Sequence, residues 1–111
     1  MSSYTLEDKG EGHFALSGKM TFATVESILD DSETPFGQHT RLEVDLSGIT
    51  GSDSAGLALL LEWITWANHT VREIRFTEMP ERVLAIARTT EVDALLTRGE
   101  RWSGFIESPE S

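Results

Sequence analysis

The sequence contains no cysteine among its 111 residues. Disulfide bonds and thiolate metal sites are therefore excluded. Basic residues are also scarce: nine Lys and Arg stand against nineteen Asp and Glu, which leaves a formal net charge of −10 at pH 7. A field of this sign repels phosphate backbones and anionic lipid surfaces. We therefore expect no direct binding to nucleic acid or to a bare membrane.

Long hydrophobic runs are missing as well. The longest fully apolar stretch, residues 56–61, is far shorter than the ~20 residues that span a bilayer. The first eight residues contain neither the basic region nor the apolar region of a secretory signal. The expectation is a cytoplasmic protein with no direct membrane insertion. A chain of this length suits one domain over 1–111, with a core over 1–98 and a C-terminal tail over 99–111.

Hydrophobic spacing predicts alternating strands and helices. Strands are expected over 4–7, 13–17, 42–46 and 71–77, with a hairpin turn at 9–12 and a loop at 47–52. Helices are expected over 21–31 with Phe22, Val25, Ile28 and Leu29 inward, over 54–68, and from Pro80 with Val83, Ile86 and Ala87 inward. A last short turn is expected at 91–96. The pattern predicts an α/β fold, a small mixed β-sheet covered by helices.

No metal, nucleotide or hydrolytic site is complete in the sequence. The histidines lack ligand-like spacing: His13, His39 and His69. Residues 17–20 read Ser-Gly-Lys-Met and lack the earlier glycine and the following hydroxyl of a phosphate loop. Residues 52–56 nearly match the nucleophile elbow of hydrolases, but Ser52 stands at its first glycine, and no later histidine is placed to act as a base. We expect neither enzyme activity nor a cofactor.

Residues 42–61 carry the most specific pattern, LEVDLSGITGSDSAGLALLL. An alternating strand, a loop and Asp-Ser-Ala-Gly-Leu at the start of a helix resemble the signature of STAS domains, which are shared by anti-sigma factor antagonists and sulphate-transporter tails. The resemblance extends over most of the chain. It implies a STAS fold, like that of anti-sigma factor antagonists, and a protein that docks onto a partner.

Within that family the chain is similar to the STAS subunit of Mla-type ABC systems, which move phospholipid between membranes and serve outer membrane lipid asymmetry. The similarity lies in GLALLLEW at 56–63, ALSG at 15–18 and the short acidic chain. It implies a non-catalytic subunit that binds and supports the ATPase subunit, and through it a permease, at the cytoplasmic side of the inner membrane. The alternative is an anti-sigma factor antagonist switched by phosphorylation of Ser54.

Ser54 stands at the position that sigma-regulatory STAS proteins present for phosphorylation. A helix N-terminus favours a phosphate there, whereas the preceding Asp53 disfavours it by like-charge repulsion. The alternative is that Ser54, with Ser52 and Asp53, simply caps the helix. In either case Ser52, Asp53, Ser54 and Ala55 are predicted to contact a partner.

The helix over 54–68 has two apolar faces at about 100° per residue. Its core-facing stripe is expected to hold Leu57, Leu60, Leu61 and Ile64. Near the opposite side fall Leu59, Trp63 and Trp66, which are predicted to extend the partner-binding surface. The alternative is that the tail residues Trp102, Phe105 and Ile106 fold over them.

We predict that the purified protein neither hydrolyses ATP nor binds it tightly, because the phosphate loop is incomplete. Isothermal calorimetry checks this, and saturable binding of micromolar affinity would contradict it.

Overall fold

The computed structural model describes residues 3–89, which form a four-stranded sheet and three helices. In chain order the elements are β1 (Tyr4–Gly10), β2 (His13–Met20), α1 (Val25–Phe36), β3 (Arg41–Ser52), α2 (Ser54–His69), β4 (Glu73–Thr77) and α3 (Glu81–Thr89). The strand order is β1-β2-β3-β4, with β1 antiparallel to β2 and the other pairs parallel. The prediction of an α/β fold with a small mixed sheet is confirmed. The predicted turn at 91–96 and the boundary at residue 98 lie outside the described residues.

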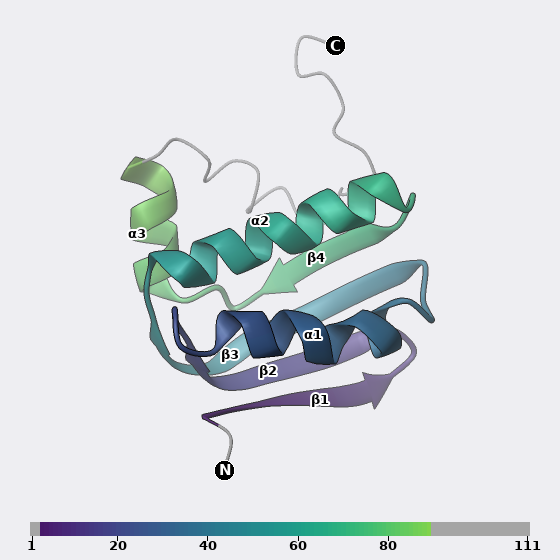
Figure 1. Ribbon diagram of the computed structural model, residues 1–111, viewed down its shortest axis with the longest axis horizontal. Coiled ribbons are helices and arrows are strands. Elements are labelled where there is room, and N and C mark those ends of the chain that lie inside the picture. Colours follow the sequence, from purple (N-terminus) through teal and green to yellow (C-terminus); the bar gives the residue numbers. More distant parts are fainter. Residues whose placement is uncertain (1–2, 90–111) are drawn as a thin grey trace, which may run out of the picture.

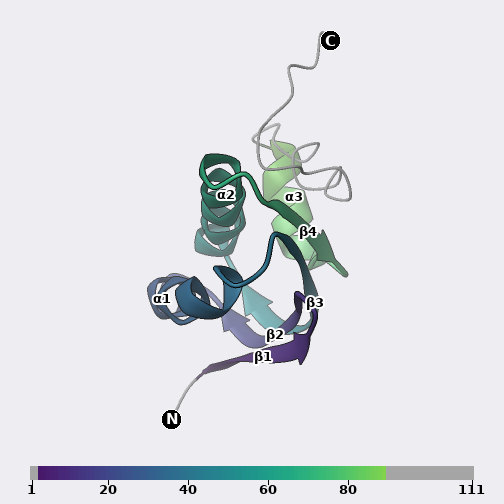
Figure 2. The same ribbon diagram turned by 90° about the vertical axis from the view of Figure 1, so that its right-hand side faces the viewer.

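Helices α1 and α2 lie side by side on one face of the sheet, and α3 lies beside the start of α2 (Figures 1 and 2). Alternation along the strands accounts for this arrangement: Leu42, Val44 and Leu46 of β3 are buried beneath the helices, while Glu43 and Asp45 point to the other face. The core therefore sits between the sheet and the two helices.

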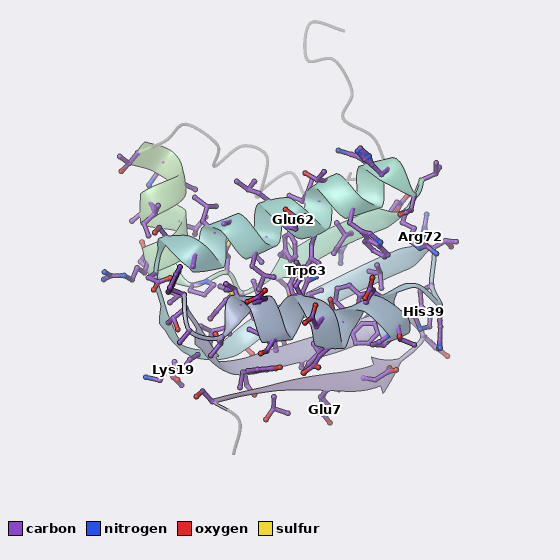
Figure 3. The ribbon with its side chains drawn as sticks, in the orientation of Figure 1. Glu7, Lys19, His39, Glu62, Trp63 and Arg72 are labelled. Carbon is purple, nitrogen blue, oxygen red and sulfur yellow. The ribbon has the colours of Figure 1, made fainter. Side chains whose placement is uncertain are left out.

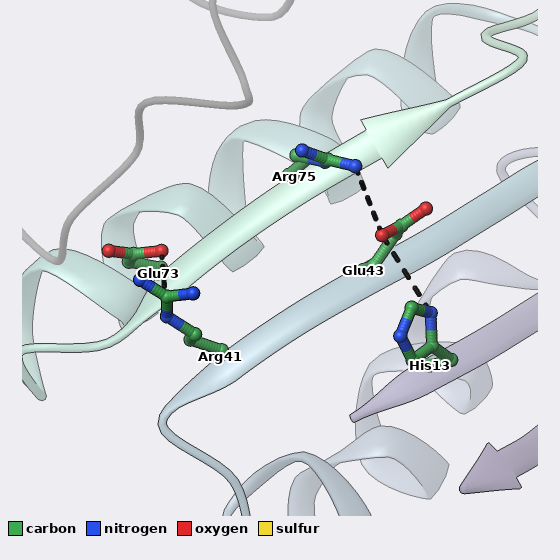
Figure 4. Close-up of polar contacts among 5 residues, drawn as sticks. All are labelled: His13, Arg41, Glu43, Glu73 and Arg75. Atoms are coloured by element: carbon green, nitrogen blue, oxygen red, sulfur yellow. Dashed lines mark hydrogen bonds and ion pairs between the residues drawn. The ribbon is translucent and has the colours of Figure 1, made fainter. Parts of the chain in front are cut away.

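The face of the sheet away from α1 and α2 is polar and carries cross-strand ion pairs. Glu43 lies between Arg75 at 3.2 Å and His13 at 3.7 Å, and Arg41 lies 3.4 Å from Glu73 (Figure 4). Exposed pairs of this kind contribute at most about 1 kcal/mol each. Their main consequence is that the carboxylates of this face are partly neutralised.

The loop predicted at 47–52 is wrong, because β3 continues through it to Ser52. Strand β2 runs on to Met20 and supplies parallel partners for this part of β3: Ser17 pairs with Gly48, and Met20 pairs with Ser52. A Cβ on Gly48 would lie 2.6 Å from the Ser17 Cβ, so the glycine allows the strands to approach at an irregular register. Glycine here marks a bulged strand rather than the end of one.

The first helix begins four residues later than predicted, at Val25 rather than residue 21. Thr24 is buried and fastens the turn before it: its hydroxyl donates to the Lys19 carbonyl at 2.9 Å and accepts from the Thr21 N–H at 3.0 Å. Phe22 therefore precedes the helix and is 85% exposed, so its predicted inward position is wrong.

Leu59 and Trp63 are buried, at 3% and 1% exposure, so their prediction as an exposed docking face is wrong. Trp63 lies between the two helices (Figure 3), where its ring contacts Phe36 of α1 and stacks on Phe76 of β4. Its indole N–H donates to the buried Ser32 hydroxyl at 3.0 Å. The physical reason for the error is that α1, rather than solvent, covers this side of α2.

Trp66 is half-buried, with its ring 6.2 Å from that of Phe36 and the Arg72 guanidinium 5.0 Å from its centre. Leu61, predicted to face the core, is also half-buried, whereas Leu57, Leu60 and Ile64 are buried as expected. The tail residues given above as the alternative cover of the tryptophans, Trp102, Phe105 and Ile106, lie outside the described residues. Within the described residues, α2 exposes only a narrow stripe, at Ser54, Ala58, Glu62, Thr65 and His69.

We predict that Trp63→Ala lowers the free energy of unfolding by about 3–5 kcal/mol, because it leaves a cavity between both helices and β4. Ser32→Ala should cost about 1–3 kcal/mol by leaving the buried indole N–H without its acceptor. Chemical denaturation measures both. The control is Phe22→Ser, which should stay within about 0.5 kcal/mol because the ring is exposed. A loss below 1 kcal/mol for Trp63→Ala would contradict the core assignment.

Candidate functional site

The predicted motif lies at the edge of the sheet where the parallel strands β2 and β3 end. Met20 and Ser52, the last residues of these strands, pair with each other, and α2 begins directly after β3 (left side of Figure 1). Strand β4 ends earlier, at Thr77, opposite Asp45. The carboxyl ends of parallel strands are the usual place for sites in open α/β sheets. Here the edge is made by the loop between β2 and α1 and by the start of α2.

Asp53 holds these two segments together. Its backbone is extended, and its Oδ1 accepts from the Ala55 N–H at 2.8 Å, so Asp53 is the N-cap of α2. Its Oδ2 accepts from the Phe22 N–H at 3.2 Å. One carboxylate thus satisfies a free N–H group at the helix start and fixes the β2–α1 loop against it.

Gly56 lets α2 begin close to β2. A Cβ at this position would lie 2.8 Å from the Met20 carbonyl oxygen and 3.0 Å from the Met20 Cε. Met20 is fully buried, so neither atom has room to move away without disturbing the core. The glycine of the motif therefore serves close packing of the first turn of α2 against β2.

Ser54 is the first residue of α2 and is exposed. Its hydroxyl forms no hydrogen bond with any residue in the described part of the chain, because Asp53 supplies the cap. Ser52 is half-buried as the last residue of β3, where it pairs with Met20, and Ala55 is half-buried in the first turn. The capping alternative thus holds for Asp53 and not for Ser54.

Phe22 is the residue of this edge that the sequence did not reveal. Phe22 and Val71 are the two large hydrophobic residues of the described chain that are strongly exposed. The sequence did contain a signal. Thr24 is of a residue type preferred at helix N-caps, and it stands just before the apolar residues with helical spacing, so a helix starting after Thr24 would have left Phe22 outside it. We call the set Phe22, Ser52, Asp53, Ser54 and Ala55 the motif edge.

The structure separates the motif edge from the predicted tryptophan surface. Leu59 and Trp63 are buried, and Trp66 lies twelve residues beyond Ser54, about 18 Å along the helix axis at 1.5 Å per residue. Of the seven predicted partner-binding residues, four therefore gather at one place: Ser52, Asp53, Ser54 and Ala55.

The described residues offer little for catalysis or membrane insertion. No group of three His, Asp or Glu side chains within residues 3–89 is arranged to hold a metal ion. No helix in this part of the chain is long and apolar enough to cross a membrane.

Comparison with known proteins fits the architecture at the level of family and fold. A family model described as "Mlab, STAS domain" matches residues 5–97, so the chain belongs to the STAS domain family, and the predicted resemblance to its Mla-type members is confirmed. No match to the curated proteins is found by sequence.

Solved structures with a similar fold include the anti-sigma factor antagonist SpoIIAA in its unphosphorylated form. The TM-score is 0.64 at 15% identity, covering 96% of this chain and 90% of that one. The Bacillus cell fate determinant SpoIIAA in its phosphorylated form gives 0.62 at 14% identity, covering 96% and 94%. The STAS fold, like that of an anti-sigma factor antagonist, is thereby confirmed.

We predict that Asp53→Ala lowers the free energy of unfolding by about 0.5–2 kcal/mol through loss of the cap. Ser54→Ala should change it by less than about 0.5 kcal/mol, since that hydroxyl is unbonded. Asp53→Asn separates the two bonds, because its one carbonyl oxygen can keep the cap while its NH2 group cannot accept from the Phe22 N–H, so it should lose less stability than Asp53→Ala. Thermal and chemical denaturation measure all three, and equal losses for Asp53→Ala and Ser54→Ala would contradict the capping assignment.

Proposed function

We propose that the protein is a non-catalytic subunit of a phospholipid-transport ABC complex and that it binds the ATPase subunit through the motif edge. Through that subunit it would be held near a permease at the cytoplasmic side of the inner membrane. The observation that carries the proposal is the pairing of an exposed Phe22 and an unbonded Ser54 on either side of Asp53. Membership of the family described as "Mlab, STAS domain" supports this choice of partner.

The motif edge has the composition of a small interface centre. An exposed Phe is unremarkable by itself, but aromatic side chains that enter a partner's pocket contribute most of the binding energy at many interfaces. Phe22 is held in place by its backbone bond to Asp53, so docking would not require the loop to become ordered first. Ser54 adds a free donor and acceptor beside it.

A catalytic role for Ser54 would need a base, and within residues 3–89 neither the adjacent Asp53 nor His69, the histidine of α2, can serve. Activation of a serine requires a base within hydrogen-bond reach. Asp53 is already bound to two N–H groups, and His69 lies at the other end of α2, about 22 Å away along the helix axis at 1.5 Å per residue. The environment of the Ser54 hydroxyl therefore favours binding of a partner over nucleophilic catalysis.

The second candidate is an anti-sigma factor antagonist whose partner kinase modifies Ser54. Two observations favour it: the hydroxyl is exposed and forms no hydrogen bond within residues 3–89, and the fold resembles that of SpoIIAA in its phosphorylated form. The helix N-terminus would stabilise the added phosphate, while the Asp53 carboxylate would oppose it. Both candidates use the motif edge and differ in whether the complex is permanent or switched.

Affinity purification from native membranes separates the two candidates. Recovery of an ABC ATPase together with a permease is the expected result. Recovery of a soluble kinase-like anti-sigma factor instead, with Ser54 phosphorylated, would replace the first candidate by the second.

We predict that Phe22→Ser weakens binding to the recovered ATPase subunit at least about thirtyfold, the equivalent of ~2 kcal/mol for a central aromatic. Ser54→Glu should also weaken binding by adding a charge that the interface must desolvate. Calorimetry measures both, and the melting temperatures should stay close to the parent's.

Val71→Ser is the matched control for Phe22→Ser. Val71 is 75% exposed and adjoins Arg72, at the end of the molecule opposite Lys19 and the motif edge (Figure 3). Its substitution should leave affinity within about threefold, as expected for a residue outside the contact. Equal losses for the two variants, or unaltered affinity for Phe22→Ser and Ser54→Glu, would remove the motif edge from the interface.

A further inference from the structure

A groove separates α1 from α2 on the side away from the sheet. Apolar side chains line it, Leu29 and Phe36 from α1 and Trp63 and Trp66 from α2, and its volume is about 210 Å³. Phe36 and Trp63 are almost fully buried, so the accessible apolar surface belongs mainly to the half-buried Leu29 and Trp66. The groove volume is below the about 300–1,000 Å³ of small-molecule pockets, so a protein side chain suits it better than a cofactor. The groove lies well along α2 from the motif edge.

Three carboxylates line this groove: Asp30 and Glu33 from α1, and Glu62 from α2. Figure 3 labels Glu62 on α2, above Trp63. All three are exposed, and none forms an ion pair with a residue of the described chain. Neither helix contains a Lys or Arg. The helix face thus differs from the open face of the sheet, where Glu43 and Glu73 have cationic partners.

Trp66 already accepts a cation from within the chain. The Arg72 guanidinium lies 5.0 Å from its ring centre. Arg72 forms no ion pair with the three carboxylates, and its side chain donates instead to the His39 and Gly37 carbonyls, each at 2.8 Å. The carboxylates around the groove thus lack a salt-bridge partner within the described residues and lie beside aromatic rings, an arrangement that favours guanidinium and ammonium groups.

We propose that this groove binds a basic segment of a partner protein, with an apolar side chain on the aromatic floor and Arg or Lys side chains against Asp30, Glu33 and Glu62. The charge pattern selects this occupant. A second copy of the chain or an anionic lipid surface would bring more negative charge to a protein whose net charge is already −10. The inference does not depend on which partner binds the motif edge.

The test uses the full chain and a blocked peptide of about ten residues with two Leu flanked by Arg, titrated by calorimetry. Binding is expected, and peptides with Gln for Arg or Ser for Leu should bind at least about tenfold more weakly because they lose the charge or the apolar anchor. In ¹H–¹⁵N spectra the Trp66 indole resonance should shift on binding. Equal binding of all three peptides would overturn the proposal.

Two triple variants distinguish the groove from general attraction to an acidic protein. The rim variant carries Asp30→Asn, Glu33→Gln and Glu62→Gln. The control variant carries Glu11→Gln, Glu26→Gln and Glu78→Gln, which change net charge equally at exposed positions outside the groove. The rim variant should lose at least about tenfold in affinity and the control less than about threefold. Equal losses would overturn the proposal.

Three further outcomes bear on the identity of the occupant. Unchanged peptide binding by Phe22→Ser would show that the groove binds independently of the motif edge. The groove proposal and the proposed function can therefore fail separately. Concentration-dependent dimerisation that the rim variant abolishes would overturn the proposal in favour of a second copy. A gain of about tenfold in peptide affinity on replacing Arg98 and Arg101 with Gln would overturn it in favour of the chain's own tail.

Discussion

The burial of Trp63 is the packing interaction on which the arrangement of both helices depends. Its ring contacts Phe36 of α1 and Phe76 of β4, and its indole N–H is satisfied by Ser32. A tryptophan brings about 150–250 Å² of surface to such a contact and has one polar atom that must find a partner. A hydroxyl on α1 meets that need, so the contact fixes how α1 lies against α2 as well as how closely. Both the groove and the loop that leads into α1 follow from that placement.

At the other end of α2, a close approach and a carboxylate position the motif edge. Gly56 lets the first turn lie against the end of β2, and Asp53 then reaches both that turn and the Phe22 N–H. The two segments are more than thirty positions apart in sequence, with |i−j| = 31 for the Asp53–Phe22 bond. The Asp53 side chain therefore joins the β2–α1 loop to the start of α2, and the two segments form one surface.

The sequence predicts those features that depend on local spacing. Alternation identified the buried positions of β3, and helical spacing gave α2 to within one residue at its end. It failed where a distant segment decides the outcome. The residues at 47–52 look like a loop until β2 supplies their hydrogen bonds, and Trp63 looks exposed until α1 covers it. Periodicity reports that a helix has two apolar faces, but not which neighbour covers the second.

For the motif edge too, the sequence predicted the residues that are neighbours in the chain and missed the one whose exposure depends on a distant contact. The Asp-Ser-x-Gly pattern located four members of the motif edge, since they are consecutive in the chain. Phe22 was missed because its exposure depends on where α1 begins, which Thr24 settles by bonding to the end of β2. Because the predicted helix began four residues too early, Phe22 was expected in the core although its ring is exposed.

At the motif edge, residues that stabilise the fold lie next to residues that contribute little to its stability. Asp53 and Gly56 have structural duties, because one caps α2 and the other permits its approach to Met20. Ser54, between them, has no hydrogen bond in the described structure, and Phe22 buries little of its ring. Such positions change at small cost to stability, so their chemistry is available for recognition. Asp53 and Gly56 fix the backbone on either side of Ser54, and Asp53 also holds the Phe22 N–H, so the backbone that carries the exposed hydroxyl and ring is already ordered. Binding of a partner at this edge would therefore avoid the entropy cost of ordering that backbone.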